Sequence, residues 1–146
     1  MTETKLGVAQ GWNENYFAKL TAASQLSKDD SGKTLFLNLA AGFTTELPAS
    51  TSIGAGWHVN MIIGVNPTTA YIITEDTDVD TDILVTNGIA ELEVDTEDDG
   101  PSNTGHTTLT FVADTAIRGD EISIKFDGTN FFINGHTKAD GAVTLA

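Results

Sequence analysis

The sequence contains no cysteine and no apolar run long enough to cross a bilayer. Without cysteine, the chain has no disulfide, no thiolate metal ligand and no thiol nucleophile. Its longest apolar runs are short, and Met61–Ile63 is an example. Residues 1–10 lack the basic segment followed by an apolar segment that a signal peptide has. We therefore expect a soluble protein that is made in the cytoplasm.

Positive charge is absent from the whole stretch between Ala41 and Ile117. The same stretch contains the acidic runs Asp76–Asp82 and Glu97–Asp99, and the chain has a net charge of −14. Such a surface repels phosphate, which disfavours binding to nucleic acid and to anionic membranes. Acidic and basic residues balance in the first forty residues, so we expect that region to face an acidic partner if the protein docks electrostatically.

The length of 146 residues fits one domain, preceded by a weakly patterned segment at residues 1–32. Two structures fit this segment: a short helix, or an extended arm that orders only on a partner. The helix is indicated by apolar residues at roughly helical spacing, namely Tyr16, Phe17, Leu20, Ala23 and Leu26.

From Lys33 onward, apolar and polar residues alternate with the period of β-strands. Residues 59–65 are nearly all apolar, which predicts a strand covered on both faces. Ala90, Leu92 and Val94 alternate with acidic residues, which predicts a strand with an acidic outer face. Further strands are predicted from the apolar residues at 35–39, 71–74, 109–113, 122–126 and 131–133.

The clearest turn is Asp127-Gly128, which lies between two apolar runs and predicts a hairpin that Gly135 closes. Asn87-Gly88 predicts a second tight turn. Many short strands separated by turn residues are typical of a sandwich or barrel. The sequence thus predicts an all-β fold: a single compact antiparallel β-sandwich or barrel at residues 33–146, with an N-terminal arm or short helix at residues 1–32 that contacts a partner.

The Asp76–Asp82 run has acidic residues at alternate positions, like the start of a calcium-binding EF-hand loop. The match fails, because Thr81 stands where that loop requires glycine and Asn87 where it requires a bidentate Glu. We interpret the run as a solvated loop or strand edge. Loose Ca²⁺ binding by four Asp side chains on one face of an extended chain is the alternative.

No motif predicts catalysis, a metal site or a cofactor. His58, His106 and His136 are scattered and lack metal-ligand spacing. The sequence contains no nucleophile elbow, P-loop or dinucleotide fingerprint, and abundant carboxylates are not by themselves a catalytic pair. Trp57 directly precedes an apolar strand and is expected in the core, whereas Trp12 lies in a polar segment and is suited to anchoring a partner.

Two stretches resemble a widespread family of bacteriophage virion proteins. The first comprises residues 31–49 and 54–59, and the second comprises residues 108–113, 119–124 and 127–135. Family members commonly carry Gly-Asp-Trp and a Trp-Tyr pair after the Asp-Gly-Thr-Asn turn. Here Glu121 replaces the first Trp, and Phe131-Phe132 replace the pair. Similar turns also occur in tail-fibre tips, and the resemblance implies no active site.

The resemblance implies a head decoration (cement) protein that lies on the outer capsid surface of the virion. Its expected partner is the major capsid protein, and its expected oligomeric state is a homotrimer. We expect the N-terminal segment to contact the coat through Lys5, Trp12, Tyr16 and Phe17. A tail-fibre or receptor-binding module that recognises host surface glycans is the alternative. An enzyme is the least favoured class, because no motif supports it.

Overall fold

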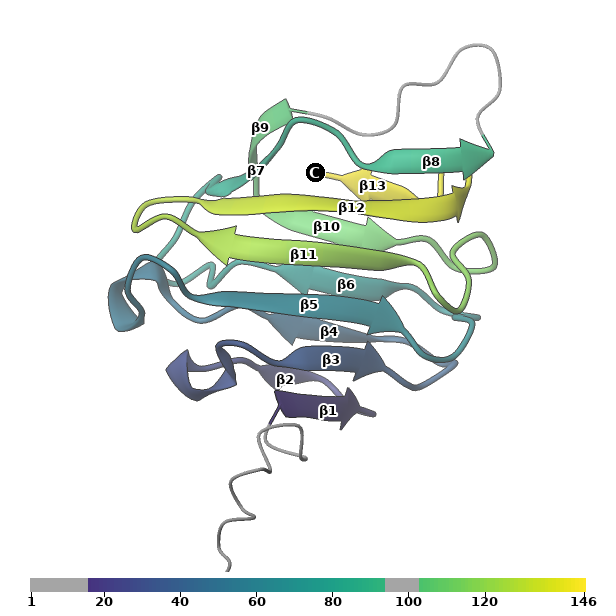
Figure 1. Cartoon of the computed structure of the whole chain (residues 1–146), viewed down its shortest axis with the longest axis horizontal. Coiled ribbons are helices and arrows are strands. Elements are labelled where there is room, and N and C mark those ends of the chain that lie inside the picture. The colour runs from purple at the N-terminus through teal and green to yellow at the C-terminus, as the bar shows by residue number, and fades with distance from the viewer. Residues whose placement is uncertain (1–15, 94–102) are drawn as a thin grey trace, which may run out of the picture.

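The computed structural model describes residues 16–93 and 103–146, and these residues form two β-sheets (Figure 1). The larger sheet has the order β1-β3-β5-β11-β12-β7-β9, and β8 also pairs with β12. The smaller sheet, which lies behind the larger one in Figure 1, has the order β13-β10-β6-β4-β2. The larger sheet comprises β1 (Phe17–Leu20), β3 (Thr34–Leu37), β5 (His58–Ile63), β7 (Leu84–Thr86), β8 (Ala90–Glu93), β9 (Asn103–His106), β11 (Glu121–Phe126) and β12 (Phe131–Ala139). The smaller sheet comprises β2 (Ser24–Gln25), β4 (Phe43–Glu46), β6 (Tyr71–Thr74), β10 (Thr108–Phe111) and β13 (Val143–Leu145).

The N-terminal half of the described chain winds alternately through the two sheets. Strands β1, β3 and β5 pair in parallel in the larger sheet, and β2, β4 and β6 pair in parallel in the smaller one. Short 3₁₀ turns at Lys28–Asp30 and Ser50–Ser52 lie on the connections between the sheets. Parallel neighbours need a long connection, and here the connection is a passage through the opposite sheet.

The C-terminal half adds antiparallel pairs to this parallel coil. Strand β11 pairs with β5 and β12, and β10 pairs with β6 and β13. The predicted hairpin at Asp127-Gly128 is confirmed, because it joins β11 to β12 with Phe126 opposite Phe131. However, β12 continues to Ala139, so Gly135 lies inside the strand and does not close the hairpin.

Apolar side chains from both sheets form one core. Its fully buried members include Leu37, Ile63, Tyr71, Phe111 and Phe131. Burial of each large side chain contributes about 1.5–3 kcal/mol, which is why the alternating pattern determines which strand face turns inward. Trp57 is in this core as expected, where its ring packs edge-on against Phe131.

The all-β prediction is confirmed, but the antiparallel one is wrong, because the sheets are mixed. The short helix is also wrong: residues 17–20 and 24–25 are strands that pair with β3 and β4. Part of the expected arm therefore belongs to the sheets. Strand β5 is buried on one face only, since His58 and Asn60 are exposed. No helix among the described residues is long and apolar enough to cross a membrane.

The predicted face of β8 is inverted. Glu91 is buried and Leu92 is 68% exposed, whereas the alternation pattern predicted an acidic outer face. Both β7 and β8 run parallel to β12, so Asn87-Gly88 is a bend within one sheet edge and not a reversal. Val85 pairs with Phe132 of β12, and Ala90 pairs with His136. Four residues separate Val85 from Ala90, whereas three separate Phe132 from His136, so the chain has one extra residue here. One extra residue turns every following side chain to the other face.

Candidate partner-binding surface

Strand β1 forms one end of the larger sheet, at the lower edge of Figure 1. Tyr16 directly precedes it and is 54% exposed, and Phe17 opens it and is 43% exposed. The ring of Phe17 packs edge-on against that of Phe36, with 6.5 Å between their centroids. The structure therefore places the predicted partner-binding residues Tyr16 and Phe17 together on an exposed edge. The other two, Lys5 and Trp12, lie outside the described residues.

A groove of about 310 Å³ runs over the outer face of the larger sheet beside this edge. The register places Lys19 opposite Phe36 and Phe36 opposite Ile62, so one row of outward side chains crosses β1, β3 and β5. Phe36 and Ile62 form an apolar floor, and Arg118 from the loop before β11 completes the lining. The groove thus combines an apolar floor with a cation on each side.

Arg118 is held in place by a β-turn over residues 117–120. Asp120 N donates to the Ile117 carbonyl at 3.0 Å, and Gly119 has the positive φ of 103° that the third position of a type II turn requires. The buried Asp120 carboxylate accepts hydrogen bonds from Ile117 N and Lys138 N, both at 2.9 Å. The turn is therefore fastened to the larger sheet.

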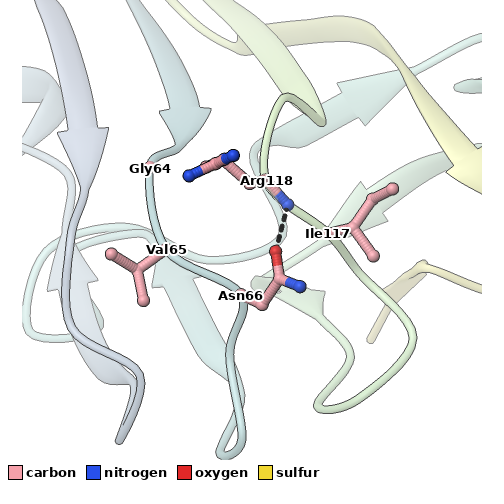
Figure 2. A pocket seen from close by; sticks show the side chains of 5 residues that line it. All are labelled: Gly64, Val65, Asn66, Ile117 and Arg118. Carbon is pink, nitrogen blue, oxygen red and sulfur yellow. Dashed lines mark hydrogen bonds between the residues drawn. The ribbon is translucent and has the colours of Figure 1, made fainter.

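Beside the groove, Arg118 also borders a second hollow (Figure 2). Figure 2 shows the guanidinium reaching towards Gly64, while Arg118 N donates to Asn66 Oδ1 at 2.7 Å. The backbone of Arg118 is thereby fixed, while its charged group remains available on the surface. No sequence pattern indicated a role for Arg118, although it is the first cation after a stretch of acidic chain.

The cations of this groove have no ion-pair partner among the described residues, as is also true of Lys28 and Lys125 but not of Lys33 or Lys138. Lys33 pairs with Asp30 at 2.9 Å, and Lys138 pairs with Glu93. Neither Lys19 nor Arg118 forms an ion pair with another described residue. In a chain with a net charge of −14, two cations without such partners beside an apolar floor favour an anionic, partly apolar binding partner.

The acidic run after β6 serves a structural role. The fully buried Glu75 accepts hydrogen bonds from Asp82 N and Ile83 N, both at 2.9 Å. Asp76 and Asp80 are also buried, and they bind Gln25 and Ser50 of neighbouring segments. The run is a loop as predicted, but our interpretation that its carboxylates are solvated is wrong for Asp76 and Asp80.

The acidic loop also influences Glu46 at the end of β4. Its pKa is raised, first by desolvation and then by the negative charges of Asp76 and Asp78. Within the described residues, no three His, Asp or Glu side chains are grouped so that they could hold a metal ion. His58 Nδ1 donates a hydrogen bond to the Gly56 carbonyl oxygen at 2.9 Å, and His136 Nδ1 lies 3.6 Å from Glu121 Oε1.

No family model matches the chain, and comparisons with curated proteins and with solved structures also find no match.

Proposed function

We propose that this protein is a non-enzymatic bacteriophage head decoration protein that docks on the outer surface of the major capsid protein lattice. The observation that carries the proposal is the exposed aromatic edge at Tyr16 and Phe17, which lies beside the groove of Lys19 and Arg118. The partner is a segment of coat protein that presents carboxylates next to apolar side chains. The resemblance to virion proteins supports the choice of coat protein as that partner.

The energetics of such docking follow from the surface. Full burial of an aromatic side chain contributes about 1.5–3 kcal/mol, and because Phe17 is 43% exposed, covering its remaining surface contributes about 1 kcal/mol. Lys19 and Arg118 then select acidic partners and orient the contact. Because the protein binds only the assembled lattice, it stabilises the head by mass action.

The proposal includes three further features. The two sheets pack as a sandwich, the decorating unit is a homotrimer at a symmetry axis of the lattice, and the acidic remainder of the surface keeps crowded copies apart. The trimer follows from analogy with other decoration proteins and not from a particular residue.

The test measures binding of the purified full chain to heads assembled without it. We expect Phe17→Ser and Arg118→Glu each to weaken binding by about tenfold, equivalent to about 1.4 kcal/mol. The matched control is Phe132→Ser on β12, because Phe132 and Phe17 are both 43% exposed. We expect the control to bind like the parent chain.

Cryo-electron microscopy of the same particles then locates the bound protein. Regular density over the capsid lattice, with β1 towards the coat, is the expected result. Density restricted to the tail, or equal losses from Phe17→Ser and Phe132→Ser, would overturn the assignment.

A further inference from the structure

Three neutral polar side chains form a row across the outer face of the larger sheet. The register places Asn60 of β5 opposite Ser123 of β11, and Ser123 opposite Asn134 of β12. All three point outward, because their strand neighbours Val59, Ile122 and Ile133 are buried. Neighbouring strands lie about 4.8 Å apart, so the row spans roughly 10 Å.

This row borders a hollow of about 360 Å³. Gly135 of β12 lies in its lining, and a side chain cannot be added there, because a Cβ would lie 2.2 Å from the Glu121 carbonyl oxygen. Glu121 and His136 face each other at 3.6 Å on another part of the lining. The backbones of β11 and β12 therefore pack closely at Gly135, and the side chains that line the hollow around it are mostly polar.

We propose that this hollow binds a neutral saccharide. Neither the two Asn amides nor the Ser123 hydroxyl forms a side-chain hydrogen bond with another described residue. Each amide presents an oxygen acceptor beside an NH₂ donor, an arrangement that suits adjacent hydroxyl groups of one sugar ring. Ser123 adds a hydroxyl that both donates and accepts.

An exposed aromatic ring lies beside the hollow and offers an apolar surface to a bound sugar. Phe132 precedes Asn134 by two positions, so both side chains are on the same face of β12, about 6.6 Å apart along the strand. Its ring, 43% exposed, can cover the apolar C–H face of a sugar. Anionic sugars are disfavoured by Glu121 and by the net charge of −14.

The saccharide hollow and the docking groove are at different places on one face. Phe17 is on β1 and Phe132 on β12, which are four strand positions, or about 19 Å, apart in the sheet. The hollow and the groove adjoin at β5, where Ile62 of the groove lies opposite Glu121 of the hollow. Phe17 and Phe132 therefore mark the two far ends of this surface, and separate variants can test each end. The inference does not depend on the proposed function, since saccharide binding can be measured on the isolated chain.

The experiment is an NMR titration of the full chain, labelled with ¹⁵N, with the methyl glycosides of glucose, galactose, mannose and N-acetylglucosamine. We expect saturable shifts of the Asn60 and Asn134 side-chain NH₂ signals with at least one of them. Asn134→Ala and Phe132→Ser should each weaken that binding by about tenfold. The matched control is Asn87→Ala, an exposed asparagine in the bend between β7 and β8, which should bind normally.

The methyl glycoside of sialic acid is titrated in the same way as the anionic comparison. Three outcomes would overturn the inference: no saturable shift with any of the four neutral glycosides, unchanged binding by the double variant Asn60→Ala/Asn134→Ala, or tighter binding of the sialic acid glycoside than of all four. Phe17→Ser and Arg118→Glu should leave the titration unchanged. Failure of head docking and failure of saccharide binding are thus distinguished by separate variants.

Discussion

Replacement of Glu75 by Gln tests whether the buried carboxylate organises the acidic loop. Glu75 is 0% exposed, and its Oε1 and Oε2 atoms accept hydrogen bonds from Asp82 N and Ile83 N, each at 2.9 Å. Gln has nearly the same shape, but it has one acceptor oxygen and one NH₂ donor. The NH₂ group of Gln would therefore face the backbone N–H of either Asp82 or Ile83, and that N–H would lose its acceptor.

The expected cost combines two effects. A hydrogen bond to a charged group contributes about 1.5–3 kcal/mol, and a buried N–H without an acceptor costs about 1–3 kcal/mol. The neutral amide recovers part of the cost of burying the charge. We therefore expect Glu75→Gln to lower the free energy of unfolding by about 3 kcal/mol, which is a large share of the stability of a domain this size.

The assay is urea denaturation at pH 7, followed by the fluorescence of buried Trp57. With a slope of about 2 kcal/mol per molar urea, the midpoint should fall by about 1.5 M. The control is Glu93→Gln, since the exposed Glu93 forms only a surface ion pair with Lys138, worth at most about 1 kcal/mol. A change of less than about 0.5 kcal/mol for Glu75→Gln would refute the role assigned to the two bonds.

Three further predictions concern single positions. Tyr71→Phe should cost about 1–3 kcal/mol in urea denaturation, because it leaves the Leu39 N–H that binds Tyr71 Oη at 3.0 Å without its acceptor. Burial raises the pKa of Tyr71, so the stability of the parent chain should fall as pH rises above 10.0, and Tyr71→Phe should lose this dependence. Gly135→Ala should unfold the chain or lower its melting temperature strongly, measured by circular dichroism, because its Cβ would overlap the Glu121 backbone. Desolvation alone would raise the pKa of Asp30, but bonds and charge from Lys33 and Ser27 N–H outweigh it and lower the pKa. The free energy of unfolding of the parent chain should therefore fall as pH drops below 3.8, and the fall should be smaller in Asp30→Asn.

The strands that the sequence predicted well are those with strict alternation and a nearby turn. Leu35 and Leu37, or Ile122 and Ile124, are buried at alternate positions, and Asp127 fixes its hairpin by accepting hydrogen bonds from Thr129 N and Asn130 N. Alternation has the same period in parallel and antiparallel pairs. The pattern therefore did not reveal that the strands from β1 to β6 wind in parallel through both sheets.

Short strands and changes of register account for the other features that the sequence did not predict. Tyr16, Phe17 and Leu20 fit helical spacing, but β1 has only four residues and its pairing with β3 determines its structure. The inversion of β8 depends on one extra residue before Ala90, which an alternation pattern does not locate. Tyr16 and Phe17 were candidate binding residues from the sequence and are exposed in the fold, whereas Arg118 meets Lys19 only through the folded sheet.

The motifs that carry the resemblance and the residues that carry the proposed contacts are largely separate. Gly119 and Asp120 build the turn before β11, and Asp127 caps the hairpin that follows. These residues fix backbone, and any chain that keeps them can keep the scaffold. Phe17 and Arg118 only project from that scaffold, so a chain with the same motifs but an acidic residue at position 118 should fold alike and lose the acidic partner.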